Sequence, residues 1–242
     1  MDPSAEYIRI FSEHTQQNRP VKLYNTYRGV PISYEAFIVR VDPWYVTASV
    51  HEFQAVCLAL DNITHIQSSL LPEVLRARSI TVDVRAREAR LTEFLSAGQS
   101  VGKRTMVRVQ PKEPIDVEIF DSGRRVPAIV ADLSTNGIGV VTFAAYIYGN
   151  MAFERGAEVF TDLRLPDNEQ TVRFQGRIAS VNPKGKYTHR LGLTLNPNSA
   201  SETMLKKYIA GRQEEILMEL KGVYDSMCAA PRKKTGPILG QT

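Results

Sequence analysis

The chain has 242 residues, 43% of them hydrophobic and 23% charged, a balance that is typical of one large or two small folded domains and excludes a fibrous or wholly disordered protein. No apolar run approaches the roughly 18 residues of a membrane span, so stable membrane insertion is not expected. Two cysteines without metal-site spacing exclude a disulfide framework and indicate a reducing cytoplasm. The net charge of +4 arises in the second half of the chain and suggests an anionic ligand there.

The first part of the sequence predicts a short helix followed by a small β-domain. Apolar and aromatic residues follow helical spacing between residues 7 and 14, and Pro20 ends this helix. Turn residues then separate short runs rich in β-branched and aromatic residues, which is typical of a small barrel or sandwich. The segment 70–78 fits either a strand or a helical turn. Strands are expected at 21–27, 35–41, 44–50, 55–60, 79–86 and 89–94.

A small, polar, glycine-containing stretch at 96–102 marks a domain boundary. We therefore expect a first domain at 1–96, a linker at 97–103 and a second domain at 104–198. The second domain again reads as a compact all-β unit, with turns expected at 121–124 and 182–186. Its expected strands are 106–110, 115–120, 126–134, 138–143, 158–165, 171–181 and 189–195.

After residue 198 the apolar period becomes helical, which predicts a helix at 199–228. One interpretation is a helix packed on its own barrel, and the other is a short coiled coil that forms a homodimer. The remaining residues, 229–242, are basic and rich in Pro and Gly, so a disordered tail is expected. Gln213 fills one gap in the apolar series, which consists of Ile209, Ile216, Leu220, Val223 and Met227.

The chemistry is concentrated just after the linker. Arg104 and Arg108 are four residues apart, so their guanidinium groups project to one side and suit forked contacts with phosphate or guanine. Asp132 and Ser134 are two residues apart and share one face of an extended strand. A carboxylate only accepts hydrogen bonds, which suits the N–H edge of guanine, and Gly137 allows a ligand or a turn to come close. Together these residues predict an anionic, guanine-bearing ligand.

The pattern Arg-x-x-x-Arg followed by Asp-x-Ser-x-x-Gly resembles the signature of the PilZ domain, a bacterial receptor module for cyclic di-GMP. The closing strand from Arg190 also resembles the last strand of that family. The resemblance implies a six-stranded barrel with a C-terminal helix, and it implies that Arg104 and Arg108 grip phosphates and guanine faces. It assigns the other guanine and its phosphate to Asp132 and Ser134. The basic Lys103 before the first arginine favours two bound ligand molecules.

The first domain resembles, more loosely, the companion barrel of flagellar-brake proteins, which makes the expected fold all-β with two barrels in tandem and a C-terminal helix. This layout implies a cytoplasmic receptor that changes its interdomain arrangement when it binds cyclic di-GMP. The segment from Arg104 to Arg108 is expected to be mobile before binding, because nothing obvious pairs with its charges. The expected partner is a protein of the flagellar motor, a polysaccharide synthase or a pilus machine, which would recruit the receptor to a membrane-associated assembly.

Other classes of function have weaker support. The four histidines are scattered, and no nucleophile motif, P-loop or dinucleotide fingerprint occurs, so no enzyme activity, metal or cofactor is expected. A cyclic di-GMP-responsive DNA-binding regulator is an alternative, because the second half is basic, but no helix-turn-helix is legible. A PilZ-like module that binds only protein is the other alternative, and the intact signature argues against it.

Overall fold

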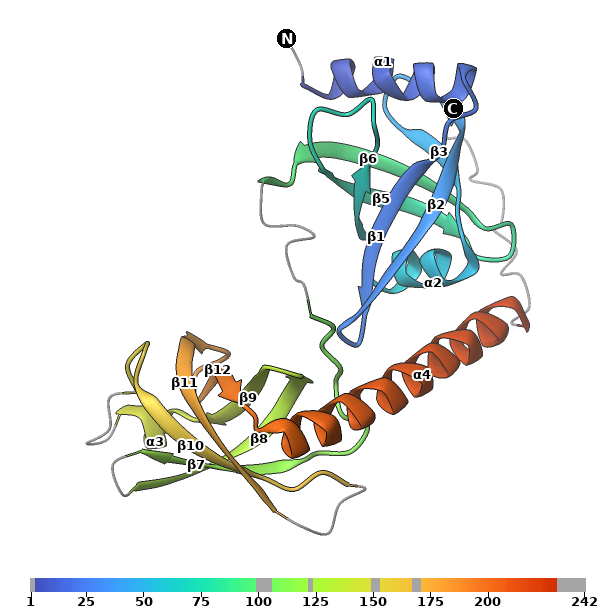
Figure 1. The fold of residues 1–242 in the computed structure, drawn as a ribbon. Coiled ribbons are helices and arrows are strands. Elements are labelled where there is room, and N and C mark those ends of the chain that lie inside the picture. The colour runs from blue at the N-terminus through green and yellow to red at the C-terminus, as the bar shows by residue number, and fades with distance from the viewer. Residues whose placement is uncertain (1–2, 99–105, 122–123, 149–152, 167–170, 230–242) are drawn as a thin grey trace, which may run out of the picture. The chain divides into compact units, whose positions relative to one another are not determined.

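The computed structural model describes residues 3–98, 106–121, 124–148, 153–166 and 171–229. These residues form two compact units, one made of 3–25, 32–98 and 218–229 and the other of 26–31 and the described part of 106–217. The strands close into two six-stranded barrels, which confirms the predicted tandem of two barrels and the six strands expected for the second (Figure 1). No helix in the described part of the chain is both long and apolar enough to cross a membrane.

The first barrel has the strand order β1-β2-β3-β6-β5-β4. Its core is the set of inward-facing aliphatic side chains together with Phe11 of α1, whose ring lies 4.9 Å from that of Phe94. Figure 1 shows α1 across one end of this barrel and α2 at the other. The elements are α1 (Pro3–Gln16), β1 (Val21–Tyr27), β2 (Val30–Val41), β3 (Val46–Ser49), α2 (Glu52–Leu60), β4 (Ile63–Gln67), β5 (Leu75–Asp83) and β6 (Glu88–Ser96).

The strand predicted at 55–60 is wrong, because these residues belong to the helix α2. His51 caps this helix, and its Nδ1 accepts a hydrogen bond from the backbone N–H of Phe53 at 3.2 Å. The five consecutive residues from Gln54 to Leu58 are all buried, so every face of the helix is covered. The sequence therefore lacks the regularly spaced polar residues that would indicate a helix. In the ambiguous segment 70–78, β5 begins only at residue 75.

The second barrel has the strand order β10-β11-β12-β9-β8-β7. Buried aliphatic and aromatic side chains alternate along its strands and fill its interior. The segment predicted as a strand at 106–110 forms only an isolated bridge, between Val109 and Leu133. The elements are β7 (Asp116–Asp121), β8 (Arg124–Ser134), β9 (Gly137–Phe143), α3 (Ala144–Tyr148), β10 (Glu158–Leu163), β11 (Val172–Pro183) and β12 (Thr188–Asn196).

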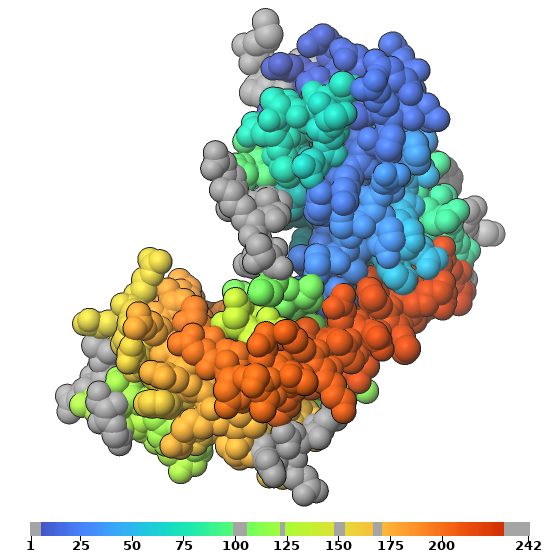
Figure 2. All heavy atoms as spheres, viewed as in Figure 1, coloured from blue at the N-terminus to red at the C-terminus, as the bar shows by residue number. Residues whose placement is uncertain are grey.

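The predicted C-terminal helix is α4 (Ser199–Ala229). Asn198 begins it, since its side-chain oxygen accepts the backbone N–H of Ser201 at 2.9 Å. The gap in the apolar series is filled by Arg212, which is buried, and not by Gln213, which is half-buried. In Figure 2 the outward face of the first turns of α4, in orange, is open at the surface. The buried face of the helix consists of Ser201, Leu205, Ile209, Arg212, Ile216 and Leu220.

Candidate functional site

The site is built at the end of β8, where a β-bulge changes the alternation of the strand. Val130 pairs with Val140, but the next partner along the ladder is Asp132, which lies opposite Gly139. Strict alternation would turn Asp132 toward the core together with Val130. The extra residue of the bulge instead places Asp132 on the outer face of the barrel, and Ser134 follows it there opposite Gly137.

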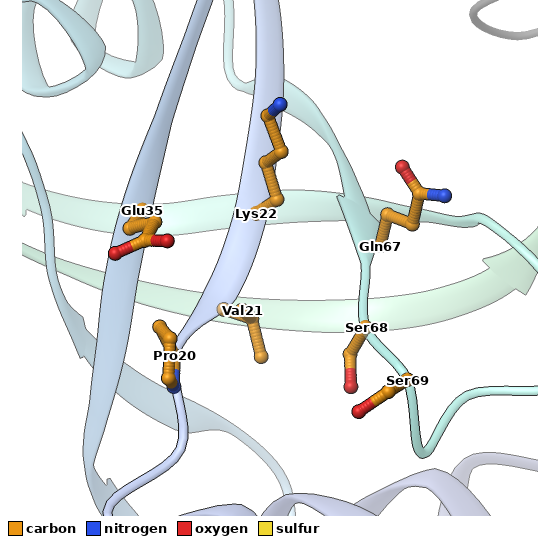
Figure 3. Close-up of a pocket in the computed structure, with 7 residues that line it drawn as sticks. All are labelled: Pro20, Val21, Lys22, Glu35, Gln67, Ser68 and Ser69. Atoms are coloured by element: carbon orange, nitrogen blue, oxygen red, sulfur yellow. The ribbon is translucent and has the colours of Figure 1, made fainter.

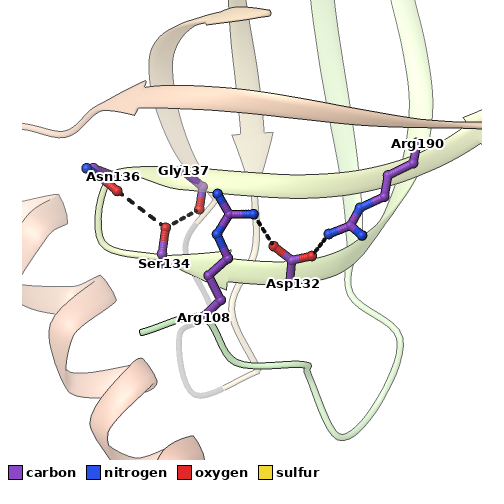
Figure 4. Close-up of polar contacts among 6 residues, drawn as sticks. All are labelled: Arg108, Asp132, Ser134, Asn136, Gly137 and Arg190. Carbon is purple, nitrogen blue, oxygen red and sulfur yellow. Dashed lines mark hydrogen bonds and ion pairs between the residues drawn. The ribbon is translucent and has the colours of Figure 1, made fainter. Parts of the chain in front are cut away.

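Two arginines converge on the carboxylate of Asp132 (Figure 4). Nη1 of Arg108 lies 3.5 Å from its Oδ1, and Nη2 of Arg190 hydrogen-bonds its Oδ2. The side chain of Asp132 is only 11% exposed, whereas those of Arg108 and Arg190 are 42% and 44% exposed. The result is a nearly buried negative charge flanked by two half-exposed guanidinium groups, an arrangement that can meet phosphates and the polar edges of a base.

Gly139 makes room for this arrangement. A Cβ atom at this position would lie 2.7 Å from Oδ2 of Asp132 and 3.0 Å from Nη2 of Arg190. The carboxylate of Asp132 therefore lies flat against the bare backbone of the neighbouring strand. Any side chain at residue 139 would push Asp132 away from Arg190.

Ser134 and Gly137 shape the turn between β8 and β9. The Ser134 hydroxyl donates to the carbonyl oxygen of Gly137 at 3.0 Å and lies 3.4 Å from Oδ1 of Asn136. Ser134 is buried, and a Cβ atom at Gly137 would lie 3.1 Å from the carbonyl oxygen of Leu193. In this structure the two signature residues hold the tight turn that supports Asp132.

The structure thus brings together four of the six predicted site residues: Arg108, Asp132, Ser134 and Gly137. Lys103 and Arg104 lie outside the described residues. Arg108 corrects the expectation that nothing pairs with the motif arginines, because Asp132 of the same motif pairs with it. Sequence reasoning missed Arg190 and Gly139. Only the pairing of β9 with β12 could have indicated that these two residues belong to the site. A single sequence does not reveal the register in which barrel strands pair.

The first barrel carries a depression of about 300 Å³ lined by β1, β2 and the end of β4 (Figure 3). Among its lining residues are Lys22 and Glu35, one charge of each sign, and Ser68. The Ser68 hydroxyl lies 2.5 Å from Nε2 of the buried His14, whose Nδ1 lies 3.2 Å from the carbonyl oxygen of Arg19. These contacts hold α1 against the barrel. A structural role therefore explains why His14 is buried here, and no catalytic role is needed. Within the described ranges, no group of His, Cys, Asp and Glu side chains has the arrangement of a metal site.

Comparison with known protein families finds a match in the second half of the chain. Residues 102–211 match the family model described as the PilZ domain. This span contains the complete signature and both arginines that contact Asp132. No curated protein has a sequence that matches the chain significantly.

The solved structures that match the chain are distant from it in sequence. The PilZ domain with c-di-GMP of YcgR from Escherichia coli is 16% identical, with a TM-score of 0.42, and the match covers 49% of this chain and 98% of that one. Bacillus subtilis MotI/DgrA, an inhibitor of motility, is 14% identical, with a TM-score of 0.41 and coverage of 81% and 96%. The K. pneumonia MrkH–c-di-GMP complex is 13% identical, with a TM-score of 0.38 and coverage of 92% and 96%.

Proposed function

We propose, from the premise that residues 102–211 of this chain form a PilZ domain, that the protein is a receptor for cyclic di-GMP. The observation that carries the proposal is the convergence of Arg108 and Arg190 on the carboxylate of Asp132 at the surface of this domain. Cyclic di-GMP has two phosphates and two guanines. Guanidinium groups suit its phosphates, and a carboxylate suits the N1–H and N2–H donors of its bases.

Ligand binding would exchange the partners of Arg108. Its contact with Asp132 is long, at 3.5 Å, and its side chain is 42% exposed, so water already competes for the guanidinium group. A ligand phosphate offers Arg108 a stronger, bidentate partner. Once Arg108 leaves, Oδ1 of Asp132 is free to accept a guanine N–H. Arg108 and Asp132 would thus pair with each other before binding and with the ligand afterwards.

The remaining signature residues complete the proposed site. Arg104 would grip the second phosphate or stack on a guanine, because its planar guanidinium group suits both contacts. Lys103 next to it adds a further positive charge and favours two ligand molecules rather than one. Ser134 and Gly137 would keep the turn beneath Asp132 in shape, and a rotation of the Ser134 hydroxyl would allow it to donate to a ligand phosphate.

The receptor would pass the signal on through a change of shape. Ligand phosphates neutralise the arginines of the segment that joins the two domains, so binding would order that segment and alter the interdomain arrangement. The altered surface would then be read in the cytoplasm by a protein of the flagellar motor, a polysaccharide synthase or a pilus machine.

The test is isothermal titration of the full-length chain with cyclic di-GMP. We expect micromolar or tighter binding by the wild type and at least a tenfold loss in Arg108→Ala and in the Arg104→Ala/Arg108→Ala double variant. The matched control is Arg173→Ala, because Arg173 also pairs with an aspartate on the outside of the same barrel, Asp162, at 2.6 Å. Equal losses in Arg108→Ala and Arg173→Ala would contradict the site. No binding by folded wild type would contradict the receptor function itself.

A further inference from the structure

We infer that Arg190 is a specificity-determining residue that donates to O6 of a guanine base while Asp132 accepts from the N–H groups of the same base. This inference rests on the proposed function and extends it, since neither the family signature nor the predicted site includes Arg190. Its basis is the placement of Arg190 on β12, its contact with Asp132 and the donors that this contact leaves unused.

Arg190 lies on the same outer face as the predicted site. In the ladder between β12 and β9 it pairs with Val141, two residues from Gly139, and it reaches across Gly139 to Oδ2 of Asp132. Its strand neighbours His189 and Leu191 are buried and anchor the backbone on both sides. The guanidinium group therefore projects from a fixed strand position beside the carboxylate.

Most of the hydrogen-bonding capacity of Arg190 is available. A guanidinium group has five N–H donors, and the hydrogen bond to Asp132 uses one of them. Among the residues that the structure describes, no other hydrogen bond or ion pair of Arg190 occurs. The side chain is 44% exposed, so the remaining donors are accessible from solvent. A guanidinium group that served only to neutralise Asp132 would not need this exposure.

The pair formed by Asp132 and Arg190 matches the polar pattern of guanine. Guanine presents N–H donors at N1 and N2 and, directly beside them, acceptors at O6 and N7. A carboxylate and a guanidinium group side by side supply the complementary acceptor and donor. Adenine carries an amino group at the position of O6, so it would place a donor against Arg190. The pair therefore recognises guanine through one hydrogen-bond acceptor, Asp132, and one hydrogen-bond donor, Arg190.

Arg108 and Arg190 then have different roles. Arg108 lies outside the barrel strands, in the segment after the linker, and its contact with Asp132 is long, at 3.5 Å. It is suited to leave Asp132 for a phosphate. Arg190 is held by a barrel strand and remains beside Asp132, so its free donors face the base that Asp132 binds.

The alternative is that Arg190 acts only by orienting Asp132, and three ligands separate the two roles. Cyclic di-IMP keeps O6 and N1–H but lacks the N2 amino group, and cyclic di-AMP lacks O6. A direct contact with O6 predicts that Arg190→Gln weakens cyclic di-GMP and cyclic di-IMP by the same factor, about tenfold, and leaves cyclic di-AMP unchanged. A purely orienting role predicts the pattern of Asp132→Asn, in which cyclic di-GMP loses more affinity than cyclic di-IMP because the contact with N2 is lost.

The experiment is competition by these three ligands against a fluorescent cyclic di-GMP on the full-length chain. Arg190→Lys should recover part of the affinity for cyclic di-GMP, and Arg173→Gln, from the Arg173–Asp162 pair, is the matched control that should behave as wild type. Thermal unfolding of each variant excludes loss of the fold. Unchanged binding in Arg190→Gln, the Asp132→Asn pattern, or an equal loss for all three ligands would overturn the inference. Absence of cyclic di-GMP binding in wild type would instead overturn the proposed function.

Discussion

At the scale of single residues, the site depends on one carboxylate that is shared by two arginines. Asp132 contacts Arg108 through Oδ1 and Arg190 through Oδ2. The Arg108 side chain is 42% exposed and its contact with Asp132 is long, at 3.5 Å, whereas Arg190 keeps its own hydrogen bond to the carboxylate. The long contact with Arg108 therefore costs little to break, and a ligand phosphate can replace it without a large loss of stability.

Gly139 gives the most direct test of this geometry. A Cβ atom there would lie 2.7 Å from Oδ2 of Asp132, closer than a side chain tolerates. We expect Gly139→Ala to turn the carboxylate away from Arg190 and to weaken cyclic di-GMP binding at least tenfold, as measured by titration calorimetry. Its control is Gly185→Ala in the loop between β11 and β12, where the nearest atom to the new Cβ is 3.4 Å away. Wild-type affinity in Gly139→Ala would mean that the position of Asp132 does not matter.

The sequence could predict the signature residues but not the pair that completes them. Arg108 and Asp132 were found because the chain order of the motif is legible without a fold. Arg190 is 58 residues from Asp132 in sequence and meets it only through the pairing of β9 with β12 and the bulge in β8. Such contacts depend on barrel closure and register, which a single sequence does not specify.

At the scale of elements, α4 is attached to its barrel by a buried charge. Arg212 is 3% exposed, and its Nε donates to the carbonyl oxygen of Gln110 at 2.9 Å, while its Nη1 contacts Glu215 at 2.9 Å. Gln110 is two residues beyond Arg108 in the chain. The same side chain therefore fixes the start of the second barrel and occupies a position that an aliphatic residue would fill in a regular amphipathic helix.

We expect Arg212→Ala to be strongly destabilising. The substitution leaves the carbonyl oxygen of Gln110 without this donor and opens a cavity beneath the helix, so a loss of at least about 2 kcal/mol is expected in the free energy of unfolding. Urea unfolding measures it. Lys206→Ala is the matched control on α4, because it removes only an exposed ion pair with Glu202 and should change stability by less than about 0.5 kcal/mol. Similar values for the two variants would contradict a structural role for Arg212.

The cap of α2 makes the first barrel sensitive to acid. His51 accepts the N–H of Phe53 through Nδ1 and stacks on Tyr34 at 3.6 Å, and both contacts suit the neutral ring. Burial is the main cause that lowers the pKa of His51 below its usual value. The negative charge of Glu52 opposes this shift, and the positive charges of Arg87 and Lys221 add to it. A lowered pKa means that the stabilising contribution is present above about pH 6.5 and is lost as the pH falls through the lowered value.

Stability should therefore fall between pH 7 and pH 5, and His51→Asn should reduce that fall. Asparagine keeps an oxygen that can cap the helix but does not titrate. The measurement is the midpoint of thermal unfolding of wild type and variant at pH 8 and at pH 5. We expect the variant to lose less stability than wild type between the two values. Parallel losses would show that His51 does not contribute to the acid sensitivity.

The elements differ in how far the sequence predicted them. Most barrel strands were legible because buried and exposed residues alternate, as they do along β7 and β11. The helix α2 was mistaken for a strand because both structures bury a short apolar run. The segment around Val109 has a strand-like sequence but makes only one bridge, since the six strands of the second barrel already close the sheet without it.

At the scale of the whole molecule, the proposed change of shape would involve two closed barrels. A closed barrel has no free strand edge, so neither barrel can add a strand from the other or from a partner. Each barrel also has its own hydrophobic core. We therefore expect any change in their arrangement to involve the segment of sequence between the two barrel domains, where the predicted ligand-binding residues Arg104 and Arg108 occur.

We expect cyclic di-GMP to make the full-length protein more compact. A connection such as the predicted linker at 97–103 spans up to about 23 Å when extended, at roughly 3.3 Å per residue. If the ligand holds Arg104 and Arg108 against Asp132, the free length between the barrels shortens. Small-angle X-ray scattering should then show a smaller radius of gyration with saturating ligand, and no change in the Arg104→Ala/Arg108→Ala variant. An unchanged radius in wild type that binds the ligand would show that the signal is read on the surface of the second barrel, without a change in the interdomain arrangement.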